Sequence, residues 1–386
     1  MILADSIDRL STETAFEVLA RAAALEREGR SIINLGIGQP DFKTPDHVVE
    51  AAVKAMRDGH HGYTPANGIL PLREAVAADI AVRRGAEVNP DNIVIMPGGK
   101  PTMFFAIMLF GQPGGEIMYP DPGFPIYRSM IEYTGATPVP IILRESNGFA
   151  FSAEELLASI TDCTRLIIVN SPGNPTGGAT PREEVEKLVK GLTDHPHVTL
   201  MSDEIYSRML YGGREHVSFL AYPDIRDRLI LLDGWSKTYA MTGWRLGYSV
   251  WPDALVEKAT RLCINAHSCV NAPTQYAGIA ALTGPQDAVD QMMVAFDERR
   301  RVIVERLNAL PGFTCLDPAG AFYAFPNISC TGMSARELQK RFLEQAGVAT
   351  VAGPSFGIHA DDYIRFSYAN STENIEEAVS RIAGIL

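Results

Sequence analysis

The stretch LILLDGWSKTYAMTGWRLGYSV, residues 229–250, decides the fold of this chain. Its two ends, Leu229–Asp233 and Leu246–Val250, are short apolar runs that read as buried strands. The segment between them carries Lys237, and Arg245 lies in the apolar setting TGWRLGY. A lysine taken alone is most often a solvated surface residue, whereas an arginine in apolar surroundings is costly unless it is paired. Arg245 therefore indicates either a structural ion pair or an anion site beside two buried strands.

Outward from this stretch, helical and extended patterns alternate from Pro45 onward. Further apolar runs predict strands at Ile93–Met96, Glu116–Tyr119, Leu166–Asn170 and Val198–Ser202. Between the strands, helices are predicted near residues 46–58, 71–84, 99–111, 124–135, 181–193, 253–265, 273–283 and 287–309. Strands that are apolar on both faces and separated by helices are typical of an α/β fold, with a mostly parallel central sheet covered by helices on both faces.

From residue 286 onward the pattern changes and predicts a smaller α+β domain. Strands are expected around 313–325, 349–351 and 363–368, with helices at 334–346 and 372–384. An amphipathic helix expected at 12–28 is placed with this domain. We therefore predict a large domain over residues 45–285 and a small domain formed by residues 1–44 and 286–386.

Polar residues follow five of the predicted strands, at the sheet edge where open α/β folds bind ligands. The segments that carry them are Gly98-Gly99-Lys100, Asp121-Pro122-Gly123-Phe124, Asn174, Asp203 with Tyr206, and Ser236-Lys237. Each has an ordinary alternative: the glycine pair suits a helix cap, Asp203 an N-cap and Asn174 a turn. Pro101 follows Lys100, which excludes a nucleotide P-loop. Arg365, in the apolar segment YIRFSYA, again suggests an ion pair or an anion site. Together these residues could converge on one polar, anionic ligand.

The composition excludes several classes of protein. Lys and Arg number 34 against 46 Asp and Glu, so the net charge of −12 argues against nucleic-acid binding and against binding to a membrane surface. Apolar runs such as Met103–Phe110 are shorter than the roughly 18–20 residues of a membrane span. The start MILADSIDRL lacks signal-peptide features, so a cytoplasmic location is expected. The five scattered cysteines contain no Cys-x-x-Cys pair, so no metal site and no disulfide framework are expected.

At this point the chain resembles the fold type I, pyridoxal phosphate (PLP)-dependent class I/II aminotransferases, the aspartate aminotransferase superfamily. The resemblance covers almost the whole chain in the right order, and it is strongest to the bacterial aspartate, aromatic and kynurenine aminotransferase branch. The segments that carry it are LGIGQPDF (35–42), GYTPANGILPLREAVA (62–77), PGGK (97–100), NSPGNPTGG (170–178), SDEIYSRMLY (202–211), GWSKTYAMTGWRLGY (234–248), PAGAFYAF (318–325) and IRFSYA (364–369).

The resemblance implies the catalytic residues. Lys237 matches the lysine that forms a Schiff base with PLP and moves the proton of the substrate Cα. Asp203 matches the carboxylate paired with the pyridine nitrogen, which makes the ring an electron sink. Tyr206 and Asn174 match the groups that hydrogen-bond the 3′-oxygen of the ring. Phe124 and Ile205 would pack on the two faces of the ring.

The resemblance also implies how the phosphate and the substrate are held. The phosphate group would be bound by Gly98, Gly99, Lys100, Arg245 and Ser236. Tyr63 would reach the phosphate of a neighbouring subunit, so a homodimer with shared sites is expected. Arg365 would grip the substrate carboxylate, and Gly38 with Ile37 and Asn174 would lie against the substrate. The expected reaction is ping-pong exchange of an amino group between an L-amino acid and a 2-oxo acid, as part of amino-acid metabolism and biosynthesis.

Two departures from the family pattern bear on these expectations. Gly234 stands where a serine is often found, followed by an unusual Trp235, so Ser236 would supply a phosphate contact. The segment 263–273, which in the family lines the partner's site, offers His267, Ser268 and Asn271 but no cation for an acidic substrate side chain. Neutral or aromatic amino acids are then as suitable as aspartate, with glutamate and 2-oxoglutarate the commonest partner pair in the family.

Three alternatives to transamination stay open on the sequence. The same cofactor and fold serve C–S β-lyases, decarboxylases and cyclopropane-forming synthases. A regulatory protein that has lost catalysis is disfavoured because Lys237 and Asp203 are both present. A nicotinamide-dependent enzyme is disfavoured because no Gly-x-Gly-x-x-Gly follows a strand.

Overall fold

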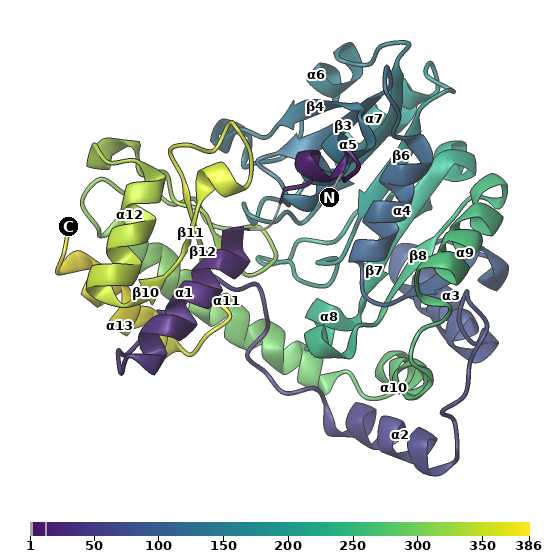
Figure 1. Cartoon of the computed structure of the whole chain (residues 1–386), viewed down its shortest axis with the longest axis horizontal. Helices are drawn as coiled ribbons and strands as arrows, with labels where there is room; N and C mark the ends of the chain where they lie inside the picture. The colour runs from purple at the N-terminus through teal and green to yellow at the C-terminus, as the bar shows by residue number, and fades with distance from the viewer. Residues whose placement is uncertain (1–2, 12–13) are drawn as a thin grey trace.

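The computed structural model describes residues 3–11 and 14–386, and its centre is a seven-stranded sheet (Figure 1). The strand order is β2-β8-β7-β6-β5-β3-β4. The strands are β2 (Ile93–Met96), β3 (Glu116–Asp121), β4 (Thr137–Ile142), β5 (Thr164–Asn170), β6 (Thr199–Asp203), β7 (Leu229–Gly234) and β8 (Gly247–Val250). All pairs are parallel except those of β8, which runs antiparallel to both β2 and β7. The predicted mostly parallel sheet is confirmed.

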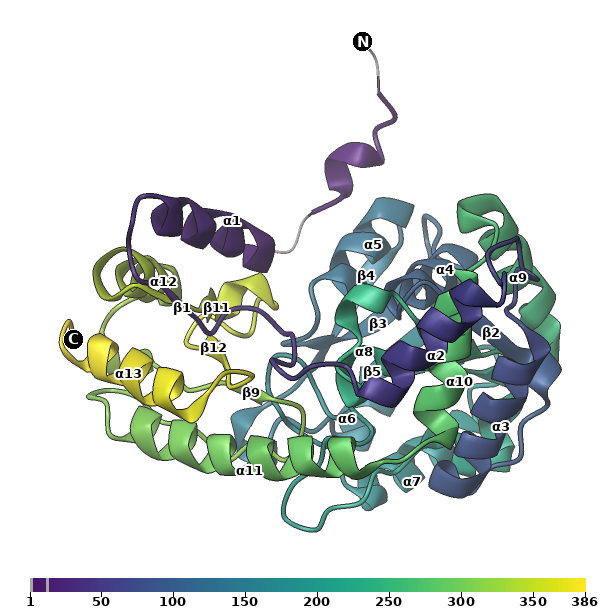
Figure 2. The ribbon, with the colours of Figure 1, turned by 90° about the horizontal axis from the view of Figure 1, so that it is seen from below.

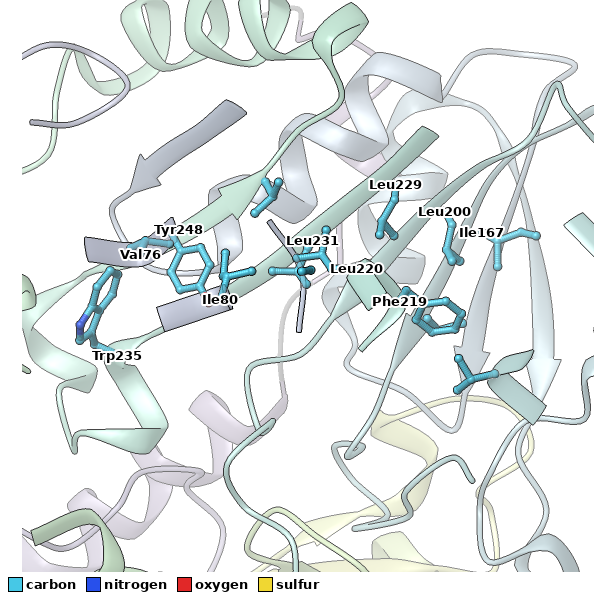
Figure 3. Packing of buried hydrophobic residues seen from close by; sticks show 14 of the residues in the cluster. Val76, Ile80, Ile167, Leu200, Phe219, Leu220, Leu229, Leu231, Trp235 and Tyr248 are labelled. Carbon is cyan, nitrogen blue, oxygen red and sulfur yellow. The ribbon is translucent and has the colours of Figure 1, made fainter. Parts of the chain in front are cut away.

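Helices cover both faces of this sheet, as predicted. On one face, alternate strand residues such as Ile167, Leu200 and Leu231 pack with Val76 and Ile80 (Figure 3). That face is covered by α2 (Asp46–Arg57), α3 (Leu70–Arg84), α6 (Ala153–Ala158), α7 (Arg182–Leu192) and α10 (Ala272–Thr283). The intervening strand residues face α4 (Lys100–Phe110), α5 (Ile126–Thr134) and α9 (Asp253–His267). The period-2 alternation of side chains thus explains why these strands are apolar throughout.

The strand β4 was not predicted from the sequence, and its two prolines explain why. Pro138 and Pro140 lack the N–H that a central strand must donate. β4 lies at the sheet edge; its first residue, Thr137, donates a backbone hydrogen bond to Gly115 just before β3, and Leu143, just after β4, donates to Asp121 of β3. The prolines alternate with these donors and therefore face the free edge, where no N–H is needed.

A smaller lobe lies beside the sheet (Figures 1 and 2). It contains α1 (Thr14–Arg27), α11 (Asp287–Asn308), α12 (Ala335–Arg341) and α13 (Thr372–Ala383). Its strands are β1 (Ile33–Asn34) paired with β10 (Val348–Ala349), and β11 (Val351–Ala352) paired with β12 (Ile364–Ser367), which also pairs with β9 (Tyr323–Ala324). The N-terminal segment therefore joins a strand from near the C-terminus.

Some predicted boundaries are wrong in this lobe. The strand expected over 313–325 is reduced to the two residues of β9, because most of the segment is irregular apart from isolated bridges at Thr314 and Gly320. The helix expected at 334–346 is α12 followed by a π-turn over Phe342–Ala346. Residues 12 and 13 of the expected N-terminal helix lie outside the described residues. Within the described chain, we find no helix whose length and apolar character would let it cross a bilayer.

The backbones of β8 and of the turn after β2 approach each other closely at Gly247. A Cβ on Gly247 would lie 2.6 Å from the carbonyl carbon of Gly98 and 3.0 Å from the nitrogen of Gly99. Both neighbours are backbone atoms, which cannot rotate away as a side chain can. The glycine therefore permits the turn from β2 into α4 to lie against β8.

We predict that Gly247→Ala destabilises the protein by about 1–3 kcal/mol, because the added methyl forces the two backbones apart. The measurement is thermal or denaturant unfolding. The control is Gly384→Ala, where the added methyl would have only ordinary contacts of 3.5 and 3.8 Å. Equal unfolding midpoints for the two variants would contradict the close-packing argument.

Candidate active site

A pocket of about 420 Å³ lies between the sheet and the smaller lobe, at the carboxyl ends of the strands. The structure brings together at this pocket most of the residues expected to bind a ligand: Ile37, Gly38, Gly99, Lys100, Phe124, Asn174, Asp203, Ile205, Tyr206, Ser236, Lys237, Arg245 and Arg365. Two expected site residues do not line it. Gly98 lies behind Arg245, and Tyr63 is 94% exposed on the surface of the chain.

Lys237 is placed by the short helix α8 (Trp235–Thr238), which follows β7 directly. Its Nζ donates a hydrogen bond of 2.6 Å to the backbone oxygen of Gly38, from the N-terminal segment. The residues before it explain the departures from the family pattern. A Cβ on Gly234 would meet the Cα of Gly247 at 2.8 Å, so a side chain is excluded there. Trp235 is buried and donates its indole N–H to the oxygen of Gly278, which anchors the helix.

Asp203 ends β6 and is almost completely buried. Its carboxylate accepts a 2.6 Å hydrogen bond from the hydroxyl of Tyr127 on α5 and a 3.2 Å bond from the N–H of Ile205. Burial raises the pKa of Asp203 to about 7, although both of these hydrogen bonds act to lower it. A carboxyl group in this state is suited to a cationic partner, because such a partner would offset the cost of burying its charge.

Arg365, on β12, joins the smaller lobe to the pocket. Its Nη1 donates to Oδ1 of Asn174 at 2.8 Å, and its Nη2 donates to the oxygen of Gly36. The Cζ of its guanidinium lies over the rings of Tyr323 and Phe356, 4.7 Å from each centroid. This stacking fixes the plane of the guanidinium while the side chain borders the pocket, an arrangement suited to a carboxylate.

A pair of tyrosine hydroxyls lies beside Arg365. Those of Tyr206 and Tyr323 are 2.8 Å apart, and both side chains are buried. Burial, reinforced by Tyr323, raises the pKa of Tyr206 well above its usual value, so this phenol remains protonated and can donate a hydrogen bond. Gly38 packs against the same pair, because a Cβ there would lie 2.1 Å from the Tyr323 hydroxyl.

The opposite end of the pocket is built for an anion. Gly98 has φ +88°, and a Cβ on it would lie 2.2 Å from Nη2 of Arg245. Arg245 itself adopts a left-handed conformation and donates to the oxygen of Thr242 at 2.8 Å. Gly99 caps α4, whose N-terminal N–H groups are a natural anion site. Lys100, the first residue of α4, lies 5.4 Å from the ring centroid of Phe124 and 5.5 Å from that of Phe16 on α1.

This donor set fits PLP. The anion end offers helix N–H groups and the cation Arg245, the aromatic ring of Phe124 lies along the wall, and the buried carboxyl of Asp203 lies farther in. Lys237 supplies an amine to the same space. Among residues 3–11 and 14–386, no group of three or more His, Cys, Asp or Glu side chains is placed to hold a metal ion.

The pocket residues that the sequence did not predict include Asn170, Tyr127, Tyr323 and Phe356. Tyr127 follows Phe124 by three residues, and this spacing at the start of a helix could have indicated that the rings lie together. Tyr323 belongs to PAGAFYAF, a segment that had been singled out without a role for this residue. Phe356 is held through its backbone oxygen, which accepts from Gly123, a tertiary contact that leaves no sequence signal.

We predict that Asp203→Asn stabilises the cofactor-free protein at alkaline pH. The folded pKa of about 7 exceeds the ordinary 3.8, so the folded state holds this proton more tightly than the unfolded state. The resulting stabilisation is present at acid pH and is lost as the pH rises through about 7. Asparagine carries no charge at any pH and avoids this loss.

The measurement is the melting temperature of the two apoproteins between about pH 5 and 9. The variant should melt above the wild type at the alkaline end, by a margin that shrinks as the pH falls. The surface substitution Asp224→Asn is the control, since Asp224 lies in an exposed turn. A margin that stays constant across the range would contradict the raised pKa.

Comparisons with known proteins agree with this geometry. The family model for aminotransferase class I and II matches residues 30–382. The chain is 37% identical to the aspartate aminotransferase of Geobacillus stearothermophilus, over 99% of this chain and 98% of that protein. It is 38% identical to the one from Pyrococcus horikoshii, over 95% of this chain and 92% of that protein.

Solved structures give the same result. The structure of Thermus thermophilus aspartate aminotransferase with maleate superposes with a TM-score of 0.95, at 33% identity and full coverage of both chains. That of the Rhizobium meliloti enzyme gives 0.94 at 35% identity, covering 100% of this chain and 98% of that chain. The chain therefore belongs to the class I and II aminotransferases, and it is a PLP-dependent enzyme of fold type I.

Proposed function

We propose that this aminotransferase takes the amino group of an L-amino acid and gives it to a 2-oxo acid in a ping-pong reaction, with Lys237, Asp203 and Arg365 as its central residues. One observation carries the proposal. Four cations from separate segments line the pocket, namely Lys100, Lys237, Arg245 and Arg365, and among the described residues Asp203 is the only carboxylate with them. A phosphorylated cofactor and a carboxylate substrate both require such a site.

The central residues divide the chemistry between them. When bound, PLP supplies an electron sink for the bond broken at the substrate Cα. Asp203 would hold positive charge at the ring nitrogen, and Tyr206 with Asn174 would donate to the 3′-oxygen. Lys237 would hold the cofactor in the absence of substrate, and its amine would move the proton at the substrate Cα. Phe124 and Ile205 would cover the two ring faces, since both line the pocket.

The substrate and phosphate ends of the pocket lie apart. Arg365, already held in plane by two rings, would bind the α-carboxylate, with Asn174, Gly38 and Ile37 beside it. Gly98 and Gly99, together with Ser236 and Arg245, would hold the phosphate. We further infer that residues 45–285 and the two segments 1–44 and 286–386 form separate domains, because most buried side chains of the smaller lobe form a hydrophobic cluster of their own, distinct from the two clusters on the faces of the sheet.

Aspartate is the amino donor that we propose. The relatives at 37–38% identity are named aspartate aminotransferases. Lys100 is the pocket cation that could accept the second carboxylate of such a donor, because its ammonium lies over the ring of Phe124, which would stack on the cofactor. The alternative for Lys100 is the phosphate, which its place at the start of α4 would also allow.

We predict that Arg365→Ala weakens the binding of every amino acid and oxo acid alike, by about 2–5 kcal/mol, because all of them share the α-carboxylate. Lys100→Gln should weaken the binding of aspartate far more than that of phenylalanine, because only aspartate has a second carboxylate. Both are measured by titrating the enzyme with each amino acid and following the absorbance of the bound cofactor. Lys54→Gln, at an exposed lysine of α2, is the control.

The Lys100→Gln variant distinguishes two proposed partners of Lys100, the second carboxylate of aspartate and the phosphate of PLP. If aspartate and phenylalanine suffer equally and the affinity for PLP falls, Lys100 binds the phosphate and the proposal of aspartate loses its support. Amino acids that release ammonia and pyruvate without any oxo acid present would instead indicate a lyase.

A homodimer with shared sites is proposed from the position of Tyr63. This side chain is 94% exposed, which suits a residue that completes the pocket of a second copy.

A cytoplasmic location is proposed because all five cysteines are free thiols.

We predict that mixing two inactive variants, Tyr63→Ala and Lys237→Ala, restores activity after subunit exchange. One of the two pockets in a mixed dimer would contain both residues, so activity should approach about a quarter of wild type. Activity is assayed after refolding the mixture, with each variant refolded alone as the control. A monomer by sedimentation, or a mixture as inactive as its components, would contradict shared sites.

A further inference from the structure

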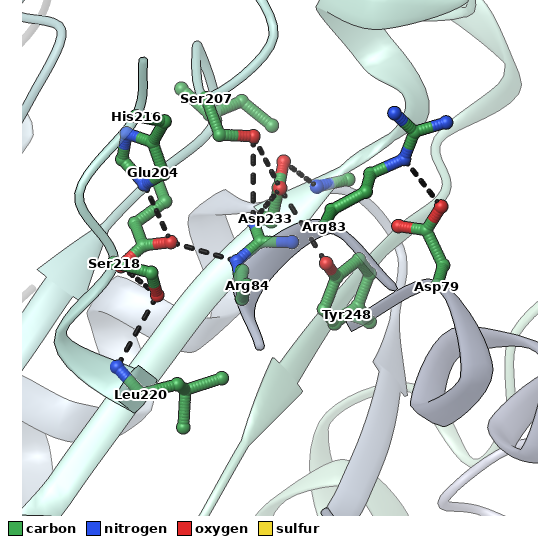
Figure 4. Close-up of polar contacts among 12 residues, drawn as sticks. Asp79, Arg83, Arg84, Glu204, Ser207, His216, Ser218, Leu220, Asp233 and Tyr248 are labelled. Atoms are coloured by element: carbon green, nitrogen blue, oxygen red, sulfur yellow. Dashed lines mark hydrogen bonds and ion pairs between the residues drawn. The ribbon is translucent and has the colours of Figure 1, made fainter. Parts of the chain in front are cut away.

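A cluster of buried charges lies behind the pocket, on the other face of β6 and β7 (Figure 4). Its centre is Arg84, the last residue of α3, whose side chain is only 3% exposed. The Nε of Arg84 donates to Oε2 of Glu204 at 2.9 Å, and its Nη2 donates to Oδ2 of Asp233. One guanidinium thus joins two carboxylates from neighbouring strand ends.

The remaining lone pairs of both carboxylates are also occupied. Glu204 accepts from the hydroxyls of Ser218 at 2.9 Å and Ser202 at 3.1 Å, and its Oε2 lies 2.8 Å from Nε2 of His216. Asp233 accepts from the N–H of Gly234 at 2.6 Å. Fully partnered buried charges of this kind fix the geometry of the elements that carry them.

The cluster is one peptide bond away from the active site. Glu204 follows Asp203, and successive strand residues point to opposite faces, so one carboxyl faces the pocket and the other faces Arg84. Asp233 lies four residues before Lys237 and holds the N–H of Gly234, where the chain leaves β7 for α8. Arg84 therefore joins the two strand ends that present Asp203 and Lys237.

The charges of the cluster act on Asp203 as well. Burial is the main cause of its raised pKa, and the negative charges of Asp233 and Glu204 raise it further. Burial also raises the pKa of Glu204, but His216 and Arg84 outweigh burial and lower that pKa to about 2. Burial raises the pKa of Asp233 as well, and Arg84 acts to lower it. The Arg84 guanidinium thus offsets the charge of both carboxylates behind Asp203.

We propose that Arg84 is a positioning residue for amino transfer: it fixes the strand ends that carry Asp203 and Lys237, and it balances the negative charge behind Asp203 so that this carboxyl can ionise against the cofactor ring. The inference rests on the proposed pairing of Asp203 with the ring nitrogen. From the other elements, Asp203 faces Tyr127 on α5, the N–H of Ile205, and Tyr206 and Lys237 across the pocket. None of these is changed in the variants below.

The test measures how tightly the apoprotein binds pyridoxamine 5′-phosphate at a series of pH values, using protein fluorescence. This probe has the ring nitrogen and the phosphate but lacks the aldehyde, so covalent attachment to Lys237 does not enter. In the wild type, affinity should rise as Asp203 ionises, with a midpoint at about pH 7. Melting temperatures of the same apoproteins report folding separately.

The variants carry opposite expectations. Arg84→Met should move the midpoint up by about one pH unit, and weaken binding at pH 7 by about fivefold, because two carboxylates lose their counter-charge. Asp233→Asn should move it down, because one of these carboxylates is neutralised. The double variant should return close to the wild-type midpoint. Arg83→Met is the matched control, since Arg83 is adjacent but pairs with Asp79 on the same helix.

A structural role alone would lower the melting temperatures without moving the midpoint, and that result would overturn the proposal. A shift in the same direction for Arg84→Met and Asp233→Asn would also overturn it. If Arg84→Met does not fold, Asp233→Asn decides by itself: a downward shift supports the proposal, and no shift or an upward shift overturns it. Failure of the Asp203 pairing shows differently, as a wild type with no midpoint whose affinity equals that of Asp203→Asn.

Discussion

Acidic side chains buried at the carboxyl ends of β6 and β7 are the constraint on which the rest of the structure depends. Three carboxyl groups, from Asp203, Glu204 and Asp233, are each less than a tenth exposed. Isolated buried charges of this kind would cost several kcal/mol each, so the fold must supply partners. Arg84 on α3 donates hydrogen bonds to Glu204 and Asp233, and Tyr127 on α5 donates one to Asp203. Helices on opposite faces of the sheet are therefore held to the same pair of strands.

The smaller lobe meets this arrangement through Arg365. Its guanidinium donates to Asn174 from the sheet lobe and to Gly36 from the N-terminal segment, and it lies over the rings of Tyr323 and Phe356. Three segments distant in sequence are thus fixed by one side chain that also borders the pocket. The residue proposed to recognise substrate is the same one that joins the lobes, so carboxylate binding and lobe contact are coupled through one guanidinium.

The sequence was informative where the pattern is local. Buried strands such as Ile93–Met96 and their following glycines, lysines and acids are visible as apolar runs that end in polar residues, and the structure brings those ends together. The strand β4 was missed because Pro138 and Pro140 are acceptable only at a free edge, and sequence does not reveal which strand is the edge. The irregular segment before β9 was likewise taken for a strand, because apolar residues pack there without a ladder.

The active-site residues that were missed act through tertiary contacts. The role of Tyr127 follows from the hydrogen bond that its hydroxyl donates to Asp203, and that of Phe356 from the contact of its ring with Arg365. Neither contact can be predicted from the sequence. The charge cluster has the same character, since Arg84 and Glu204 are separated by 120 residues. Arg84 and Arg83 are adjacent at the end of α3, and nothing in the sequence shows which of them is buried. Arg83 pairs with Asp79 on its own helix.

The alternation of Asp203 and Glu204 across β6 has a consequence for how such an enzyme can diversify. A substitution in the interior behind the sheet changes the electric potential at the carboxyl of Asp203 without altering the shape of the pocket, because Asp203 and Glu204 are adjacent in the chain but only Asp203 lines the pocket. The residues behind the sheet therefore affect reactivity, whereas the residues that line the pocket determine which substrate fits. Selection for a new amino-acid substrate can change the residues that line the pocket. The residues around Arg84 can then change independently and restore the pKa of Asp203.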